Sequence, residues 1–317
     1  MGPLGMSPWR AVLTREEIRD LVTIRDGRAW LSIALNWAII FGSLALVAAW
    51  PHGPSFPIAV VVATFLIGGR QLGLAILMHD AAHHALLRNR RWNDWAGNWL
   101  AAYPTWTDVG PYRDYHLQHH AKNYTEDDPD IGLTKPFPIT RASLRRKVIR
   151  DLTGQTGWKR VRATLARDLG RSRGRQARTV GGLRNLHGVA ISNLVIFLLC
   201  LLAGHPFVYL VWVLAWLTTF QLATRVRAIA EHAMAPDPLD PLRNTRTTLV
   251  NPLERLLFAP NGVNYHLEHH LLMTVPHYNL PRLHEMLRSR GALDHAWIEP
   301  RGYRAVLAGA APLAPES

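Results

Sequence analysis

The sequence predicts an all-α membrane protein with four transmembrane helices in two hairpins and a cytoplasmic helical cap that carries a dense set of histidines. Four long apolar runs, the placement of Lys and Arg around them, and three histidine-rich segments predict this fold class. The chain has 317 residues, enough for one large domain or two small ones. Its apolar fraction of 48% is ordinary for a soluble protein, so the distribution of apolar residues identifies the class.

Four runs are apolar enough to cross a bilayer, which takes about 20 helical residues. They cover residues 29–50, 57–78, 189–203 and 206–224. The first contains no charged residue, and the second is interrupted only by Arg70 and Gln71. There are three explanations for an Arg inside a membrane: it marks a functional site, it pairs with an acid, or its side chain extends to the membrane surface. The short third run alone could be a buried core helix, but a soluble protein does not normally carry four such runs.

The net charge of +13 is unevenly distributed along the chain. The turns at 51–56 and 204–205 contain no Lys or Arg, whereas the segment 141–184 between the hairpins is rich in Arg. Lys and Arg collect on the cytoplasmic side, so we expect both termini and the middle segment there, in a multi-pass membrane protein. The Arg-rich segment would face lipid headgroups, with docking of an acidic redox partner as a secondary alternative. Nucleic acid is not expected as a partner.

The apolar runs also predict the domain organisation. We expect a cytoplasmic N-terminal segment at 1–28, one membrane domain at 29–290 and a C-terminal tail at 291–317. The cytoplasmic cap of the membrane domain would comprise residues 79–185 and 225–290. The stretch 93–108 is apolar but too short to span a bilayer, and Pro104 interrupts it, so we expect an interfacial or re-entrant helix. The lone Cys200 lies in the third run and is expected to be a packed thiol.

Three short segments are unusually rich in histidine: HDAAHH at 79–84, HLQHH at 116–120 and HLEHH at 266–270. Residues three and four apart share one face of a helix, so the histidines of each segment would project together. The positions concerned are His79, His83, His116, His119, His120, His266, His269 and His270, and His232 follows the fourth apolar run. The spacing leaves open whether His84 belongs with them.

A metal centre explains this density of histidines better than a structural role does. Each buried imidazole needs partners for both ring nitrogens, whereas a metal takes one nitrogen and a carboxylate can hold the other. The candidate carboxylates are Asp80, Glu231, Glu268, Asp127 and Asp128. A structural zinc site needs only four ligands, so this many histidines indicates two ions. Imidazole alone does not decide among zinc, copper, iron and nickel.

The other histidines are scattered along the chain, and we expect them at the surface or at helix caps. They are His52, His187, His205, His277, His284 and His295. Replacing His284 by Ala is therefore expected to be tolerated.

With these three segments in this order, the chain resembles the membrane-bound fatty acid desaturase and hydroxylase superfamily, and in particular its bacterial members. The similarity runs from about residue 30 to 290 and includes EDDPD at 126–130. It implies two iron ions held by the three segments and by His232, with O2 as co-substrate. It also implies an external electron donor of ferredoxin or cytochrome type with its reductase. The chain departs from the family pattern at Ala228, where some members have Asn, and at Met273, where many have Pro.

The resemblance predicts an integral-membrane non-haem di-iron oxidoreductase that desaturates the acyl chain of a fatty acid or related lipid. Two alternatives on the same scaffold remain open: hydroxylation of a carotenoid or acyl lipid, and decarboxylation of a fatty acid to a terminal alkene. A histidine-rich metal transporter is a remote alternative. Transporter ligands lie along a path inside the bilayer, whereas these histidines lie at or beyond the predicted helix ends.

Overall fold

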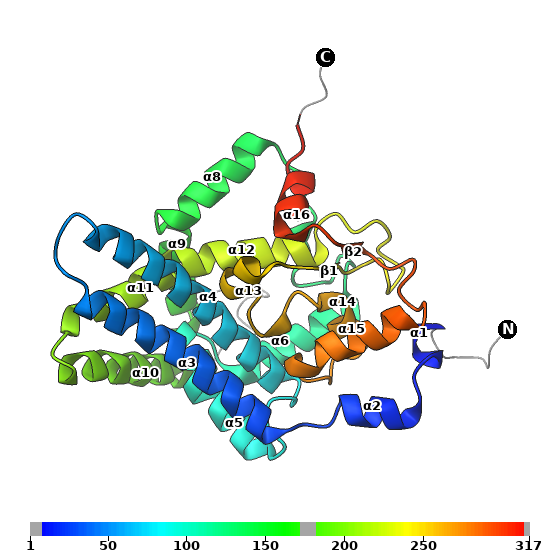
Figure 1. Cartoon of the computed structure of the whole chain (residues 1–317), viewed down its shortest axis with the longest axis horizontal. Coiled ribbons are helices and arrows are strands. Elements are labelled where there is room, and N and C mark those ends of the chain that lie inside the picture. Colours follow the sequence, from blue (N-terminus) through cyan, green and yellow to red (C-terminus); the bar gives the residue numbers. More distant parts are fainter. Residues whose placement is uncertain (1–7, 172–181, 314–317) are drawn as a thin grey trace.

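A computed structural model describes residues 8–171 and 182–313 (Figure 1). These residues form helices joined by loops, with one pair of two-residue strands, so the predicted all-α character is confirmed. Residues 1–7 and 314–317 of the predicted terminal segments lie outside the described residues. So do residues 172–181 of the predicted Arg-rich segment.

Four helical segments are long and apolar enough to cross a membrane: Arg15–Ala49, Phe56–Ala82, Gly182–Leu202 and Pro206–His232. They contain α2 (Arg15–Leu21) and α3 (Asp26–Ala49), α4 (Phe56–Ala82), α10 (Gly182–Leu202), and the pair α11 (Tyr209–Leu217) and α12 (Thr219–His232). Each segment corresponds to one predicted apolar run. Each also extends past its run at one end, because helical hydrogen bonding continues into the neighbouring polar residues.

The fourth segment is broken at Thr218, which separates α11 from α12. Thr218 has φ −120° and ψ −85°, outside the helical range, and its hydroxyl donates to the Leu214 carbonyl at 2.5 Å. A Thr hydroxyl bonded to the preceding turn often bends a helix. Gly157 of α9 (Gln155–Asp168) lies so close that a Cβ there would be 2.3 Å from the Leu217 carbonyl oxygen. The break in the fourth segment thus coincides with the contact that holds α9.

Helix α4 is central and packs against α3, α11 and α12 (Figure 1). Two glycines allow this close approach. A Cβ at Gly68 would lie 2.2 Å from Thr219 Oγ1, and a Cβ at Gly73 would lie 2.1 Å from Asn36 Oδ1. The Thr219 hydroxyl donates to the Thr64 carbonyl at 2.7 Å. Small residues and hydrogen bonds between helices of this kind hold helices together in membranes.

Arg70 and Gln71 of α4 are buried and bonded to backbone carbonyls. Arg70 donates to the carbonyl of Leu256, at the end of α13 (Pro252–Leu257), and Gln71 donates to that of Trp212 at 3.1 Å. Arg70 therefore neither pairs with an acid nor reaches the surface, which were two of the predicted alternatives. Instead, α13 covers the second half of α4, so this part of the predicted run is enclosed by protein.

The remaining helices are shorter, and most of them gather around the ends of α4 and α12 (Figure 1). They are α1 (Pro8–Ala11), α5 (Arg90–Gly97), α6 (Val109–Lys122), α7 (Ile131–Thr134), α8 (Arg141–Leu152), α14 (His266–Leu271), α15 (Leu280–Ser289) and α16 (Gly302–Ala310), besides α9 and α13. Strands β1 (Thr247–Thr248) and β2 (Ile298–Glu299) pair in parallel. This small sheet is an addition to the predicted helices.

The predicted interrupted helix at 93–108 is present as three consecutive pieces. Helix α5 continues into a π-helical turn, Asn98–Ala102, and a 3-10 turn, Tyr103–Thr105, that contains Pro104. The chain then reverses at Trp106, whose φ of 63° is left-handed. The Asp108 side chain accepts a hydrogen bond from the Gly110 amide at 2.9 Å and so caps α6. This turn delivers the second histidine segment to the end of α4.

Both ends of the described chain pack onto other helices of the fold. Glu17 of α2 forms an ion pair with Arg290 just after α15, at 2.5 Å, and Leu21 lies in one apolar cluster with Leu287 of α15. Helix α16 packs against α12. The described parts of the predicted N-terminal segment and C-terminal tail are therefore integrated with the rest of the fold.

Candidate metal centre

Four helices bring the predicted histidines together. The end of α4 supplies His79, and His83 follows as the residue that ends the helix. Three further helices face them. Helix α6 supplies His116, His119 and His120, α14 supplies His266, His269 and His270, and the end of α12 supplies His232. The spacing of three and four within each helix puts these rings on one face, as predicted.

The rings form two groups that could each hold a metal ion. The first histidine group consists of His79, His83, His116, His120 and His269, and the second of His119, His232, His266 and His270. Within each group one nitrogen per ring lies within 4.8 Å of the others. Neighbours in sequence are divided between the groups: His119 and His120 belong to different groups, and so do His269 and His270. All nine predicted histidines are thus brought together.

The ring nitrogens approach one another closely in both groups. In the first, His120 Nε2 lies 2.9 Å from His116 Nε2 and 3.0 Å from His269 Nε2. In the second, His266 Nε2 lies 2.9 Å from the Nε2 of His232 and 3.1 Å from that of His270. A neutral imidazole has one donor and one acceptor, so converging rings cannot all satisfy one another. A cation that accepts the lone pairs resolves this conflict.

Unpartnered nitrogens in the first group point to the same conclusion. Both ring nitrogens of His79 and Nε2 of His83 are buried and have no hydrogen-bond partner. Leaving a buried polar atom unsatisfied costs about 1–3 kcal/mol. The donor set therefore fits a bound metal ion better than a closed network of hydrogen bonds.

Burial disfavours the charged form of six of these imidazoles. Burial, and then the neighbouring histidines, lower the pKa of His83 to about 3 and that of His120 to about 2. The same two causes hold the pKa well below the usual value for His116, His266, His269 and His270. A neutral imidazole offers the lone pair that a metal needs.

Two of the predicted carboxylates contact histidines of the second group. Asp128 Oδ1 lies 2.8 Å from His119 Nδ1, and Glu231 Oε1 lies 3.4 Å from His266 Nδ1. Burial alone would raise the pKa of Asp128, but the hydrogen bond from His119 and two backbone amides hold it below its usual value. Glu231 also accepts from Arg227 at 2.5 Å. These contacts leave the Nε2 atoms of both histidines facing the centre.

The other three predicted carboxylates have different partners. Asp80 lies 3.7 Å from His79 Nδ1, beyond hydrogen-bond distance, and is instead bonded to the ring and the backbone amide of His277. Glu268 is fully buried and bonded to His284 and Thr247. The exposed Asp127 carboxylate accepts a hydrogen bond from Lys122 at 3.0 Å.

The prediction that His277 and His284 lie at the surface or at helix caps is wrong, because both are buried. His277 Nδ1 lies 2.7 Å from Asp80, and His284 Nδ1 lies 2.6 Å from Glu268. A signal for His284 was present in the sequence, because it lies on the apolar face of α15, next to Leu283 and Leu287 at helical spacing. His277 lies in a turn, where no periodicity marks it.

His84 lies outside both groups, which answers the question that the spacing left open. Its φ of 55° turns the chain away from α4, and its Nδ1 lies 3.4 Å from the Arg113 guanidinium. Arg113 also donates to the carbonyls of Ala81 and Ala82 and to Asp94. Arg113 thereby satisfies carbonyls at the end of α4 that have no partner within the helix.

The chain is similar in sequence to enzymes of one family. A model of the fatty acid desaturase family matches residues 55–300, which include all nine histidines. Dihydrorhizobitoxine desaturase of Bradyrhizobium elkanii is 30% identical over 87% of this chain and 81% of its own length. Beta-carotene ketolase of a Paracoccus species is 25% identical over 79% of this chain and 90% of its own length. Fatty acid desaturase 3 of Bos taurus is 24% identical over 41% of this chain and 29% of its own length.

Proposed function

Because this chain belongs to the fatty acid desaturase family, we propose that it is an integral-membrane oxidoreductase whose histidines hold two iron ions and that uses O2 to desaturate an acyl chain. The observation that carries the proposal is the convergence of nine imidazoles into two groups. The first group would hold one ion and the second group the other. Imidazole suits several transition metals, and the family favours iron.

When bound, the two ions would supply the redox chemistry for reducing O2 and for removing hydrogen from an unactivated C–H bond. The chain's own residues hold the ring nitrogens in place and keep them neutral. Asp128 fixes the ring of His119 through Nδ1, which leaves Nε2 for the metal. Burial of the rings excludes bulk water from the centre.

Desaturation removes two hydrogen atoms from adjacent carbons, and reduction of O2 to two waters takes four electrons. The substrate supplies two of them, so an external donor must supply the other two. We infer a separate ferredoxin- or cytochrome-type donor with its reductase. The substrate class is a fatty acyl chain or related lipid, although the relative from Bradyrhizobium is named for dihydrorhizobitoxine.

Oxygenation of the substrate is the second candidate reaction, and a relative favours it. Beta-carotene ketolase covers 79% of this chain, and its name denotes a reaction that adds oxygen to a carotenoid. Hydroxylation of a carotenoid or acyl lipid, and decarboxylation to a terminal alkene, would use the same histidines. The three reactions differ in product: an internal alkene, an alcohol, or a terminal alkene one carbon shorter.

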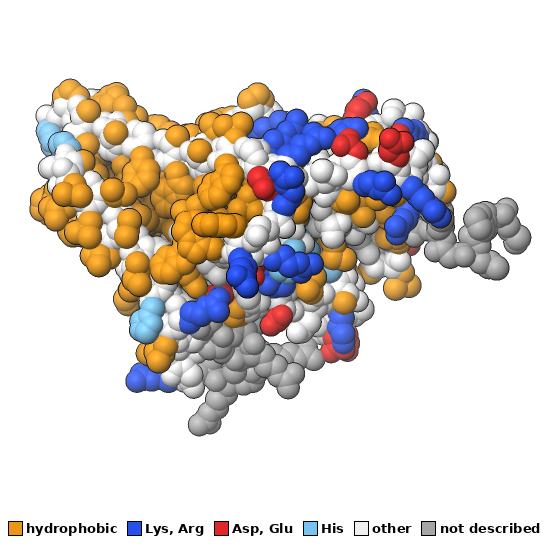
Figure 2. Space-filling model, turned by 90° about the horizontal axis from the view of Figure 1, so that it is seen from below, with side chains coloured by type: hydrophobic (Ala, Val, Ile, Leu, Met, Phe, Trp, Pro, Cys, Tyr) orange, Lys and Arg blue, Asp and Glu red, His pale blue; other side chains and the backbone are white. Residues whose placement is uncertain are grey.

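The exposed apolar surface supports a membrane location. Large apolar side chains are exposed along α3, α4, α10 and α11, among them Leu31, Leu35, Val61, Val62, Leu194, Leu198 and Leu210. Figure 2 shows apolar side chains gathered over one end of the molecule, with most Lys and Arg toward the other end. We infer that α3–α4 and α10–α12 form two transmembrane hairpins and that the histidines belong to a cytoplasmic cap.

Helix α8 supports the inferred orientation. It exposes Arg145, Arg146 and Arg150 beside the exposed apolar side chains of Ile149 and Leu152. Such a surface fits the headgroup region, where basic and apolar side chains both find partners. The protein would thus lie in a bacterial inner membrane with both termini in the cytoplasm.

The test is the metal content of detergent-purified protein, followed by mass spectrometry of lipids supplied with a reductase system and O2. We expect two irons per chain and a product two hydrogens lighter than the substrate. His119→Ala and His269→Ala, one from each group, should lose iron and activity while the exposed control His52→Ala retains both. A single zinc ion and no oxidised product would refute the proposal.

A further inference from the structure

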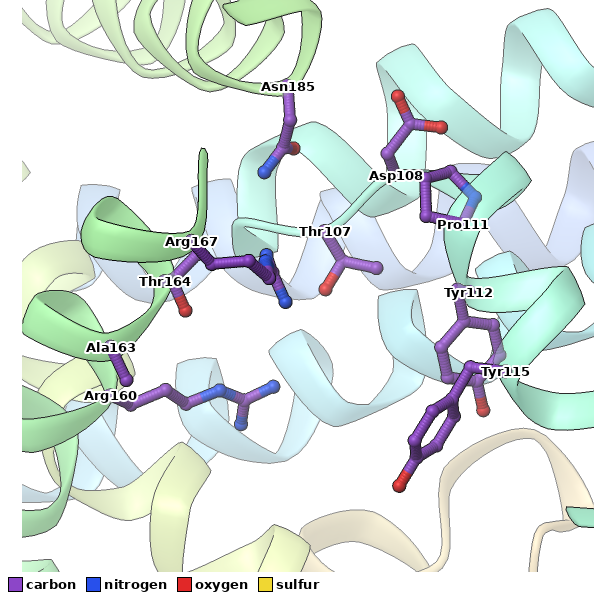
Figure 3. A pocket seen from close by; sticks show the side chains of 10 residues that line it. All are labelled: Thr107, Asp108, Pro111, Tyr112, Tyr115, Arg160, Ala163, Thr164, Arg167 and Asn185. Carbon is purple, nitrogen blue, oxygen red and sulfur yellow. The ribbon is translucent and has the colours of Figure 1, made fainter. Parts of the chain in front are cut away.

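A cavity of about 360 Å³ lies beside the metal centre, between α6 and α9. Its volume is in the range of small-molecule binding sites. Thr107, Asp108, Pro111, Tyr112 and Tyr115 line one side, and Arg160, Ala163, Thr164, Arg167 and Asn185 the other. Figure 3 shows the side chains of Arg160 and Arg167 extending from α9 into this space, toward the side formed by Tyr112 and Tyr115.

The cavity has an excess of positive charge. Arg160 donates to the Gln221 side chain at 3.4 Å and lies near the rings of Phe220 and Trp216, and no carboxylate among the described residues pairs with it. Burial lowers its pKa below the usual value, and the nearby Arg167 lowers it further. Arg160 is partly buried, and a guanidinium that loses water without gaining a counter-ion is costly.

The nearby carboxylates are already neutralised by other groups. Asp108 pairs with Arg184 at 3.2 Å. Asp168 accepts from Arg167 at 3.2 Å and from Asn185 at 2.5 Å, so it balances Arg167 only. The charge of Arg160 is therefore left for a group that enters the cavity.

One aromatic ring separates the cavity from the first histidine group. Tyr112 lines the cavity and stacks on His116 with ring centroids 5.3 Å apart and an interplanar angle of 12°. Tyr112 and His116 are four residues apart on α6, as are Tyr115 and His119. A group bound in the cavity would therefore be separated from the first histidine group by the Tyr112 ring.

We propose that this cavity binds a carboxylate at the end of the substrate, with Arg160 as its counter-ion and Arg167 as a further hydrogen-bond donor. The guanidinium fork matches the two oxygens of a carboxylate. This inference rests on the proposed function, because it identifies the cavity as part of the substrate site. It further implies that the oxidised carbon lies within a few bonds of the carboxylate rather than in the middle of a long chain.

A second cavity could take the apolar part of such a substrate. It has a volume of about 210 Å³ and is lined by Trp106, Trp212, Trp216, Val161 and other apolar side chains. Arg160 lies 6.0 Å from the centroid of the Trp216 ring, which lines the apolar cavity, so the polar and the apolar cavity are neighbours at this point of α9. An amphipathic molecule with one anionic end matches this pair of environments.

The test compares binding of dodecanoate, dodecanol and dodecyl phosphate to the iron-loaded protein in a non-ionic detergent, followed by tryptophan fluorescence. Arg160→Gln should raise the Kd for dodecanoate about tenfold or more, since charge-assisted hydrogen bonds contribute this much. Its Kd for dodecanol should stay unchanged. Arg160→Lys should retain part of the affinity. The matched control Arg162→Gln, exposed on the same helix, should bind dodecanoate like the original protein.

Two results would overturn the inference. One is an unchanged dodecanoate affinity in Arg160→Gln when its iron content and melting temperature show that it is folded. The other is an Arg160-dependent preference for dodecyl phosphate, which would assign the cavity to phosphate headgroups. The inference and the proposed function can fail separately. If the purified protein contains a single zinc ion yet binds dodecanoate through Arg160, the carboxylate site stands and the di-iron function does not.

Discussion

Replacing His284 by Ala tests whether the contacts behind α14 support the histidine groups. His284 Nδ1 lies 2.6 Å from Glu268 Oε1, and both side chains are buried. The Thr247 hydroxyl donates to the other carboxylate oxygen of Glu268. Removing the imidazole would leave Glu268 Oε1 buried without a hydrogen-bond donor. Glu268 belongs to α14, the helix that also carries His266, His269 and His270. The sequence alone predicts that this substitution is tolerated, and the structure predicts the opposite.

The expected cost follows from the burial of the pair. A hydrogen bond to a charged group contributes about 1.5–3 kcal/mol, and a buried carboxylate oxygen left without a donor costs about 1–3 kcal/mol. Thr247 remains as a donor, so we expect about 2–4 kcal/mol. For a chain of 317 residues each kcal/mol lowers Tm by about 1.5 °C, because the unfolding entropy is about 2.1 cal/mol/K per residue. The melting temperature should therefore fall by about 3–6 °C.

The assay is thermal unfolding in detergent, combined with metal analysis of the same samples. His284→Ala should melt earlier and retain less metal. His284→Gln, which keeps a donor, should lie between it and the original protein. The exposed control His295→Ala should be unchanged. A melting curve and metal content of His284→Ala equal to those of the original protein would show that Glu268 does not depend on this contact.

Three further predictions concern separate parts of the molecule. Asp128→Asn should weaken binding of one metal ion about 10–100-fold without unfolding the protein, as measured by metal competition; equal loss of both ions would contradict it. Gly73→Ala should cost about 1–3 kcal/mol, because a Cβ there would lie 2.1 Å from Asn36 Oδ1, and an unchanged Tm would refute this. The hydrogen bond from Arg290 lowers the pKa of Glu17 to about 2. The pair therefore stabilises the fold above pH 4.5 and loses this effect as the pH falls toward 2, so Glu17→Gln should be less stable than the original protein at neutral pH but equally stable near pH 2.

The sequence predicted the histidine helices well because their signals are local. Spacings of three and four place His116, His119 and His120 on one face whatever surrounds the helix. The signals of the four apolar runs are equally local, since the length and composition of each run alone indicate a possible membrane span. His232 was the exception: its place just after the fourth apolar run drew attention to it, but only the family resemblance implied that it is a ligand.

Features that depend on contacts between distant segments were predicted poorly. Asp127 and Asp128 are neighbours with the same chemistry, yet only Asp128 is buried against His119. The partner of Arg70 is a backbone carbonyl 186 residues further along the chain. His277 is buried because Asp80, from the end of α4, lies opposite it. No pattern within a short window of sequence contains this information.

The division of adjacent histidines between the two groups links the assembly of the centre to the order of synthesis. Helix α14 supplies His269 to the first group and His266 and His270 to the second. Before α14 has emerged from the ribosome and docked, the first group has four of its five rings and the second only two of its four. Neither group is complete before α14 docks. Docking of one six-residue helix completes both groups at once, so two ions held as proposed would have their full sets of ligands only after this late step.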